Sequence, residues 1–282
     1  MQALALNSRP MGGDWRKRRA ALLLLSSLAD ESDAFRKTML RPRGKAEACM
    51  KSAAAMCAAA IGDDGEHPRV HVAALVCLGL WGQSYAPRFQ KRHAVQVMPA
   101  LLQRLSPSAS PATCLRVRCA AVSCLILLCA ADGKEEGKCC PAASLAPFQR
   151  PVLESLFALL PGDAGQQQQQ QQQQQHAASL LRLHEFTLTA VSCVAAVTQA
   201  SFEQYYDVFM PRVLHIVASS TQGLITSAAA VSAAGGGGGS DAMGDAARHA
   251  SLRRRAMETV AVIGESVSKA KFQVDAATVR FD

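Results

Sequence analysis

The sequence predicts an all-α fold built as an array of repeated helix pairs. Of the 282 residues, 49% are hydrophobic and only 5% are aromatic, and Ala and Leu dominate the apolar residues, which favours helices over strands. Apolar blocks of helical length also recur along the chain. In one of them Tyr206, Phe209, Val213 and Ile216 follow the i, i+3, i+7, i+10 spacing of a single helical face.

The first helices of the expected pairs share a common start. In three blocks, one or more basic residues precede an Ala-Ala pair and an apolar run; Ala20, Ala73 and Ala120 occupy equivalent positions, 53 and 47 residues apart. Asp14 is a suitable N-cap for the first block, and Pro68 suits the first turn of the second. These blocks are therefore predicted to be successive first helices of a repeat.

A second helix is expected after each first helix, over 46–61, 88–105, 147–160 and 202–217. A helix, a turn and a second helix in steps of about 40–47 residues is the pattern of HEAT repeats. Such a unit cannot bury its apolar faces alone and needs stacked neighbours. We expect an α-solenoid of about four repeats and part of a fifth, at 14–61, 67–105, 113–160 with a charged insertion at 134–141, 179–219 and 251–282.

Low-complexity segments separate some of these helices. A glutamine run lies within 161–178, and an Ala/Gly/Ser-rich stretch covers 221–248. Such segments carry few side chains able to form a core, so both are predicted to be loops, and residues 1–13 are predicted to be disordered. In the partial repeat, the first helix is expected over 251–268 and the second from near Phe272.

The ten cysteines are predicted to be small buried side chains in a reducing compartment. Cys114, Cys119, Cys124 and Cys129 recur every five residues, a step of about 140° on a helix, so they cannot share a face or form one metal site. Most of the ten lie inside apolar helical blocks of a large chain, which is not typical of a disulfide framework.

Motifs for catalysis and cofactor binding are not found in the sequence. It has no phosphate-binding loop ending in Gly-Lys-Ser/Thr, no dinucleotide fingerprint and no nucleophile elbow. His184-Glu185 lacks a second His four residues on, and Cys139-Cys140 are adjacent rather than spaced as Cys-x-x-Cys. We therefore expect no enzyme activity, no catalytic residue, no cofactor and no metal site.

Charge and apolar runs limit the partners only in part. The net charge of +8 permits a nucleic acid, an anionic surface or an acidic protein patch and selects none. Two apolar runs, 20–29 and 119–131, are shorter than the roughly 20 residues of a spanning helix, so no membrane partner is expected. The first run follows four basic residues at 16–19 and has the pattern of a signal peptide, with a repeat helix as the preferred interpretation.

Four stretches keep the order and, insertions aside, the spacing of a known family: 14–29, 67–102, 202–217, and 257–264 with 269–272. In the third, the tripeptides Tyr-Tyr-Asp, Phe-Met-Pro and His-Ile-Val are nearly unchanged. The sequence resembles the importin-beta (karyopherin-beta) nuclear transport receptors, closest to the importin-five or karyopherin-beta-three subgroup. The stretches cover most of the chain outside the low-complexity segments.

The resemblance implies protein binding rather than catalysis. Members of this family carry cargo proteins with nuclear localisation signals into the nucleus, bind Phe-Gly nucleoporins, release cargo to the GTPase Ran, and shuttle between cytoplasm and nucleus. They are much longer than this chain. We therefore expect a middle segment of such a receptor, with the Ran-binding region mostly outside it.

Cargo contact is expected on the second helices, which line the concave face of such solenoids, where acidic residues favour basic cargo signals. One of these helices, 88–105, is instead basic. The resemblance assigns possible cargo contact to the few acids left on the others. The alternative for each is a solvated helix face. These candidates are Glu154, Glu203 and Asp207.

Two other functions remain open. The first is a structural scaffold, like the HEAT subunit of a phosphatase or a tubulin-binding array. The second is a basic helical-repeat protein that binds nucleic acid through phosphates. We rank it last, and do not expect nucleic acid as a partner, because no interleaving of aromatic and basic residues for base stacking is seen in the sequence.

Overall fold

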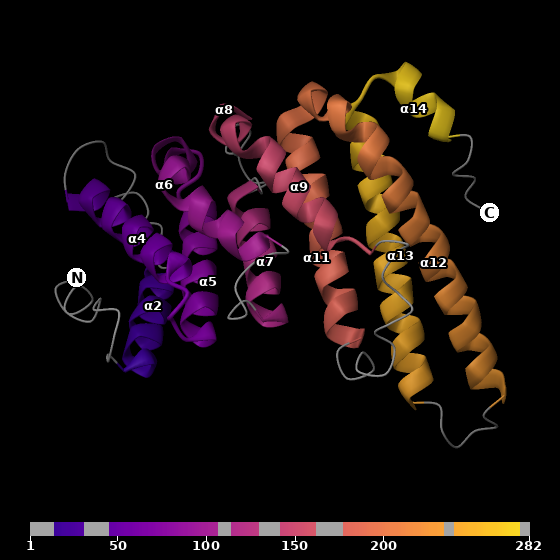
Figure 1. The fold of residues 1–282 in the computed structure, drawn as a ribbon, viewed down its shortest axis with the longest axis horizontal. Helices are drawn as coiled ribbons and strands as arrows, with labels where there is room; N and C mark the ends of the chain where they lie inside the picture. The colour runs from indigo at the N-terminus through magenta and orange to yellow at the C-terminus, as the bar shows by residue number, and fades with distance from the viewer. Residues whose placement is uncertain are drawn as a thin grey trace. The chain divides into compact units, whose positions relative to one another are not determined.

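A computed structural model describes residues 14–30, 45–106, 114–129, 142–161, 177–233 and 240–276. These residues form helices and no strand (Figure 1), so the all-α prediction is confirmed. Four of the predicted features fall wholly or mostly outside the described residues. They are the disordered start at 1–13, the insertion at 134–141, the glutamine-rich loop at 161–178 and the last residues of the partial repeat, 277–282.

The chain divides into two compact units, Met1–Ser155 and Leu156–Asp282, and the boundary falls within α9 (Gln149–Leu159). The first unit holds α2 (Trp15–Asp30), α4 (Lys45–Gly62), α5 (Pro68–Ser84), α6 (Arg88–Leu105), α7 (Leu115–Cys129), α8 (Ala142–Leu145) and the 3-10 helix η1 (Ala146–Phe148). The second unit holds α11 (Ala177–Thr198), the 3-10 helix η2 (Gln199–Tyr205), α12 (Tyr206–Ala233), α13 (Ser240–Ser266) and α14 (Lys269–Ala276).

In the first unit, the first helices α2, α5 and α7 pack side by side. Between α2 and α5, the indole Nε1 of Trp81 donates a hydrogen bond of 2.9 Å to the carbonyl of Leu25. The second helix α4 packs against both α5 and α6, and α6 packs against α7. Each second helix thus lies against the first helix of the next pair, as expected for stacked repeats.

The starts of α2 and α5 are held by side-chain caps. Asp14 Oδ1 accepts a hydrogen bond of 2.9 Å from the backbone N–H of Arg16, as predicted. In α5 the cap is His67, whose Nδ1 accepts from the N–H of Arg69 at 3.1 Å, with Pro68 at the first helical position. Each cap satisfies one of the amide groups that a helix start leaves without an internal partner.

The contact between α5 and α7 depends on two glycines of α5. A Cβ placed on Gly79 would lie 2.8 Å from Leu127 Cδ1 and 3.3 Å from the Cα of Cys124, and one placed on Gly82 would lie 2.3 Å from Leu128 Cδ2. Both glycines are buried. Their missing side chains therefore allow α7 to approach the backbone of α5 closely.

We predict that Gly82→Ala lowers the free energy of unfolding in the natural chain but raises it in a Leu128→Ala background. Overpacking against Leu128 costs about 1–3 kcal/mol, which exceeds the gain of about 1 kcal/mol from Ala over Gly in a helix. Without the Leu128 side chain, the nearest remaining atom of that residue is its Cα, 3.8 Å away. Urea unfolding of the four variants measures this, and equal effects in both backgrounds would contradict the contact.

In the second unit, the predicted apolar stripe of α12 is buried. Tyr206, Phe209, Val213 and Ile216 are each no more than 2% exposed, and the rings of Phe209 and Phe157 meet edge to face at 5.5 Å. The helices α11 and α12 both pack against α13. The core of this unit therefore forms around α13.

The predicted loop at 221–248 is wrong over most of its length. The helix α12 continues to Ala233 and α13 begins at Ser240, so only 234–239 fall outside the described residues. Alanine, the most frequent residue of this stretch, is the strongest helix former. The helix α12 is also supported by its packing along α13. Gly223 permits this approach, since a Cβ there would lie 2.6 Å from Nδ1 of His249.

The helices of the partial repeat also begin earlier than expected. The first helix was predicted over 251–268, whereas α13 spans Ser240–Ser266. The second was predicted from near Phe272, whereas α14 starts at Lys269. Phe272 instead packs its ring against Gly264 of α13, where a Cβ would lie 2.8 Å from two ring carbons.

The stretch Ala178–Ala229 is long and apolar enough, by composition, to cross a membrane. In the structure it is not a single α-helix, because η2 lies between α11 and α12. Its apolar side chains include much of the core of the second unit, among them Leu188, Val194 and Phe209, which are at most 1% exposed. Burial of these side chains accounts for part of this apolar character.

Candidate partner-binding surface

Two of the three candidate acids, Glu203 and Asp207, lie together where α12 begins. The helix α11 ends at Thr198, and Gln199 adopts a positive φ of 45° that turns the chain into η2. Glu203 is half-buried in η2, and Asp207 is exposed in the first turn of α12. An acid at this position is favoured by the helix dipole.

Lys271 of α14 joins the two acids. Its Nζ lies 3.0 Å from Asp207 Oδ2 and donates a hydrogen bond of 3.1 Å to the backbone carbonyl of Glu203. The Glu203 side chain accepts a hydrogen bond of 2.8 Å from Ser268 Oγ. An ion pair with an exposed acid contributes about 0–1 kcal/mol, so Asp207 can exchange Lys271 for another cation.

An aromatic ring completes the surroundings of this ammonium group. Lys271 Nζ lies 5.4 Å from the centre of the Tyr206 ring, within the range of a cation–π contact. The Tyr206 hydroxyl donates a hydrogen bond of 2.8 Å to Asp275 Oδ2. Burial, and then the contact with Asp275, raise the pKa of Tyr206 well above its ordinary value.

We name Glu203, Tyr206, Asp207, Lys271 and Asp275 the ammonium cluster. The ammonium of Lys271 meets the Asp207 carboxylate, the backbone carbonyl of Glu203 and the Tyr206 ring, a combination that binds a primary ammonium through charge and ring contact. The neutral amide or alcohol of another side chain would have neither the charge attraction nor the cation–π contact. The cluster is therefore suited chemically to a lysine side chain.

A groove lies beside the ammonium cluster in the same unit. It has a volume of about 660 Å³ and runs between α11, η2 and the end of α13. Its walls include Glu203 of the cluster, Ser268, which hydrogen-bonds to Glu203, and the exposed Glu265. The groove therefore brings a further acid, Glu265, to the same surface as Glu203.

The third candidate, Glu154, does not belong to this cluster. It lies on α9 within the first unit, is exposed, and pairs with Arg150 of the same helix at 2.8 Å. An exposed i, i+4 pair of this kind is the expected state of a solvated helix face. Contact between Glu154 and cargo stays a prediction.

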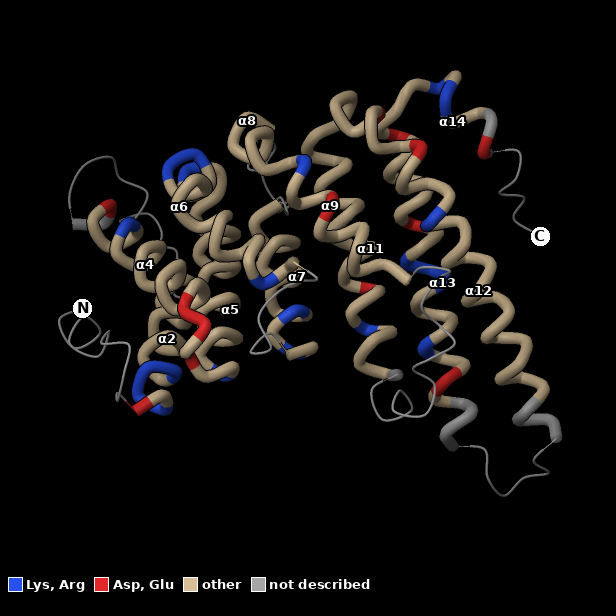
Figure 2. The backbone as a smooth tube through the Cα atoms, in the orientation of Figure 1, with Lys and Arg blue, Asp and Glu red and all other residues tan. Residues whose placement is uncertain are grey.

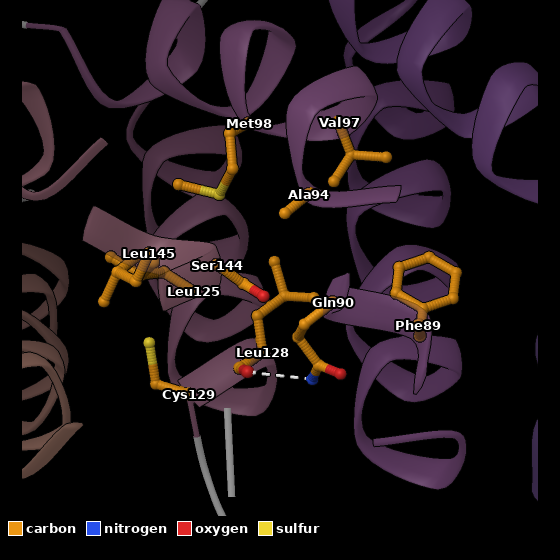
Figure 3. Close-up of a pocket in the computed structure, with 10 residues that line it drawn as sticks. All are labelled: Phe89, Gln90, Ala94, Val97, Met98, Leu125, Leu128, Cys129, Ser144 and Leu145. Carbon is orange, nitrogen blue, oxygen red and sulfur yellow. Dashed lines mark hydrogen bonds between the residues drawn. The ribbon is translucent and has the colours of Figure 1, made fainter. Parts of the chain in front are cut away.

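A small cavity in the first unit is lined by α6, α7 and α8 (Figure 3). Its volume is about 20 Å³, and its walls are mainly apolar. Gln90 spans one side, with Nε2 donating to the carbonyls of Leu128 at 3.0 Å and Gly82 at 2.9 Å. The space is too small for an organic ligand. Among the described residues no group of His, Cys, Asp and Glu could hold a metal ion.

Comparison with known proteins identifies the fold. No protein-family model matches the sequence. A crystal structure of Kap121p bound to Pho4p matches 95% of this chain with a TM-score of 0.64 and 21% identity. One of the karyopherin Kap121p bound to the SUMO protease Ulp1p matches 98%, with a TM-score of 0.64 and 21% identity.

The chain shares its helical fold with part of the karyopherin Kap121p. A third structure, of Kap121p bound to RanGTP, matches 98% of the chain with a TM-score of 0.61 and 21% identity. In all three cases this chain spans about a fifth of the solved one, since 20% of the latter is covered. The prediction of a HEAT-repeat array is confirmed by this likeness.

Only part of the ammonium cluster could be recognised from the sequence. The stripe of α12 carries Tyr206, and Asp207 follows it directly, so both were visible in one stretch. Lys271 and Asp275 lie more than 60 residues later in the sequence, on α14. They meet α12 only because the chain returns to it after α13. Their i, i+4 spacing placed them on one helical face, but nothing local indicated which helix that face would meet.

Proposed function

We propose that this chain is a segment of a nuclear transport receptor of the importin-beta (karyopherin-beta) family, and that it binds proteins without catalysing a reaction. The likeness to Kap121p over at least 95% of the chain carries this proposal. Solved structures show Kap121p bound to Pho4p, Ulp1p, Nup53p and RanGTP. The resemblance of the sequence to the same family supports it independently.

The proposed partners follow from that family. They are cargo proteins with nuclear localisation signals, Phe-Gly nucleoporins and Ran, with the Ran-binding region mostly outside this segment. The protein would shuttle between cytoplasm and nucleus. On the natural full-length protein, GTP-bound Ran should displace a lysine-rich cargo signal in a pull-down. Equal retention of the cargo with and without GTP-bound Ran would contradict the transport function.

Within this segment, we propose that the ammonium cluster contacts lysine side chains of cargo. Lys271 already occupies the position that such a lysine would take, against Asp207 and over the Tyr206 ring. A cargo lysine must therefore displace Lys271 before it can bind. The affinity observed for cargo is the intrinsic affinity reduced by this internal competition.

We predict that Lys271→Ala raises the affinity of the chain for a lysine-rich peptide, whereas Asp207→Ala lowers it. Removing a competing contact of about 1 kcal/mol increases the binding constant about fivefold. Fluorescence anisotropy of a labelled peptide measures both effects, with a peptide in which Gln replaces Lys as the reference ligand.

Glu258 provides the matched control for Asp207. It is an exposed acid of the same unit, on α13, and it is also ion-paired, with Arg255 at 2.7 Å. Glu258→Ala should leave peptide binding unchanged. Equal losses for Asp207→Ala and Glu258→Ala would indicate only a general charge effect, and weaker binding by Lys271→Ala would exclude the displacement mechanism.

A further inference from the structure

The starts of three first helices share one edge of the first unit. At the starts of α2 and α5, the Trp15 and His67 rings stack with centroids 4.2 Å apart. Toward their ends, Trp81 reaches the carbonyl of Leu25. Gly79 and Gly82, late in α5, face Leu127 and Leu128, late in α7. The three helices therefore run parallel, and their starts lie on the same side.

Exposed cations from all three helices lie on this edge, which we call the basic edge. Figure 2 shows Lys and Arg at the corresponding ends of α2, α5 and α7. None of these cations has an ion pair among the described residues, in contrast to the neighbouring Arg18, which pairs with Glu66 at 2.9 Å. The members of the basic edge are Arg16, Lys17, Arg19, Arg69 and Arg116.

This placement of charge opposes the stability of the helices. A helix start carries the positive end of the dipole, so a cation in the first turn is unfavourable by about 0.3–1 kcal/mol. None of the three helices has an acidic residue in its first turn, but the Asp14 carboxylate caps α2 and Glu66 lies just before α5. These two acids offset part of the unfavourable charge at α2 and α5, and a bound anion would relieve the remainder at the three starts.

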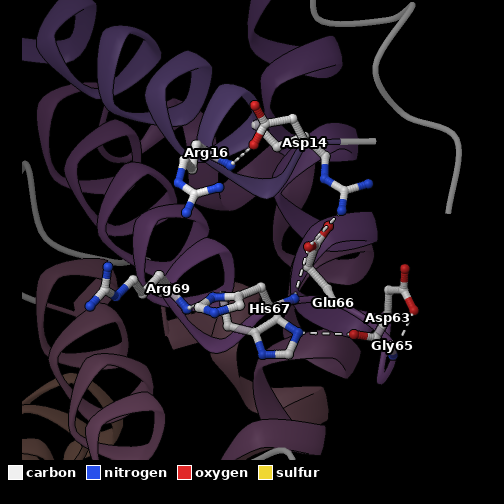
Figure 4. A network of polar contacts seen from close by, with 9 residues as sticks. Asp14, Arg16, Asp63, Gly65, Glu66, His67 and Arg69 are labelled. Atoms are coloured by element: carbon white, nitrogen blue, oxygen red, sulfur yellow. Dashed lines mark hydrogen bonds and ion pairs between the residues drawn. The ribbon is translucent and has the colours of Figure 1, made fainter. Parts of the chain in front are cut away.

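The aromatic rings on this edge are already occupied. Trp15 and His67 stack nearly parallel, at 8°, and the guanidinium carbons of Arg16 and Arg69 lie 4.9 Å and 5.5 Å from the Trp15 ring centre. Figure 4 shows Arg16, His67 and Arg69 together with the nearby acids Asp14 and Glu66. Aromatic and basic residues are thus interleaved in space, contrary to the expectation from sequence, but the stacked rings do not offer the open platform that nucleic-acid bases need.

We propose that the basic edge binds an acidic segment of a partner protein. Arg guanidinium groups bind carboxylates through paired hydrogen bonds, and four of the five cations are Arg. Three adjacent helices about 8–10 Å apart give a row of about 20 Å, the length of about six residues of extended chain. This surface belongs to the first unit and is independent of the ammonium cluster.

The test compares two double variants with the same change in charge. Arg69→Glu with Arg116→Glu reverses the basic edge on two helices. Lys51→Glu with Lys91→Glu reverses two exposed lysines on the second helices α4 and α6. Binding of a fluorescein-labelled glutamate-rich peptide is followed by anisotropy at low and high salt, and circular dichroism verifies that both variants are folded.

The natural chain should bind the peptide with an affinity that falls with salt. The basic-edge variant should bind at least about tenfold more weakly, because like charges across an interface repel, while the Lys51/Lys91 variant should stay within about twofold. Equal losses in the two variants, or no saturable binding at low salt, would overturn the proposal. Tighter, edge-dependent binding of single-stranded or duplex DNA than of the peptide would overturn it in favour of a nucleic acid.

Discussion

Replacing Arg104 with Ala is expected to lower the free energy of unfolding of the first unit by about 3 kcal/mol. The Arg104 side chain is fully buried, and its Nε donates a hydrogen bond of 2.6 Å to the carbonyl of Ile61, in the last turn of α4. Its Nη1 lies 2.7 Å from Asp64. The substitution removes a charged cap from a helix end, leaves that carbonyl without its donor, and opens a cavity.

Arg92 is the matched control on the same helix. It is 42% exposed and pairs with Glu47 of α4, so Arg92→Ala should cost less than about 1 kcal/mol. Both tryptophans of the chain, Trp15 and Trp81, lie in the first unit. Their fluorescence during urea unfolding therefore reports on this unit. Equal costs for the two arginines would contradict a capping role for Arg104.

Replacing Trp81 with Ala is expected to cost about 3–5 kcal/mol. The side chain is 1% exposed, hydrogen-bonds to the carbonyl of Leu25 across the α2–α5 contact, and lies beside the Tyr85 ring at 5.2 Å. Trp81→Phe keeps most of the buried ring and loses the hydrogen bond, so it should cost about 1–2 kcal/mol through that bond.

Trp15→Ala tests whether the large cost expected for Trp81→Ala comes from the burial of that side chain. Trp15 is half-buried and stacks on His67 at the unit's surface, so its loss should cost about 1 kcal/mol. Unfolding of all three variants can be followed by circular dichroism. A cost for Trp15→Ala as large as that for Trp81→Ala would show that the α2–α5 contact depends on the outer stack instead.

The helical array could be predicted because its signals are local. Ala20, Ala73 and Ala120 mark helices α2, α5 and α7, which the structure packs together. The spacing of Tyr206 and Phe209 identified the buried face of α12. In each case the spacing of the apolar residues and the residues at the helix start are sufficient to predict the helix, because both depend only on residues within that helix.

The features that could not be predicted depend on contacts between segments that are distant in the sequence. The segment 221–233 was predicted to be part of a loop, because the contact of α12 with α13, which supports the helix, is not visible in this segment alone. Asp207 was a candidate from its own helix, but Lys271, its ion-pair partner, is supplied by α14. The basic residues before Ala20, Ala73 and Ala120 were recognised as a shared start of three helices, but the sequence did not show that these starts lie together. Only the parallel packing of three helices brings them to one edge.

The glycines of α5 also bear on the curvature of the first unit. In stacked helix pairs, the rotation from one pair to the next depends on how closely the first helices approach relative to the second helices. Gly79 and Gly82 reduce the spacing on the first-helix side, between α5 and α7. A larger side chain at Gly79 or Gly82 would push α7 away from α5, so it would change the rotation between these two helices as well as strain the core.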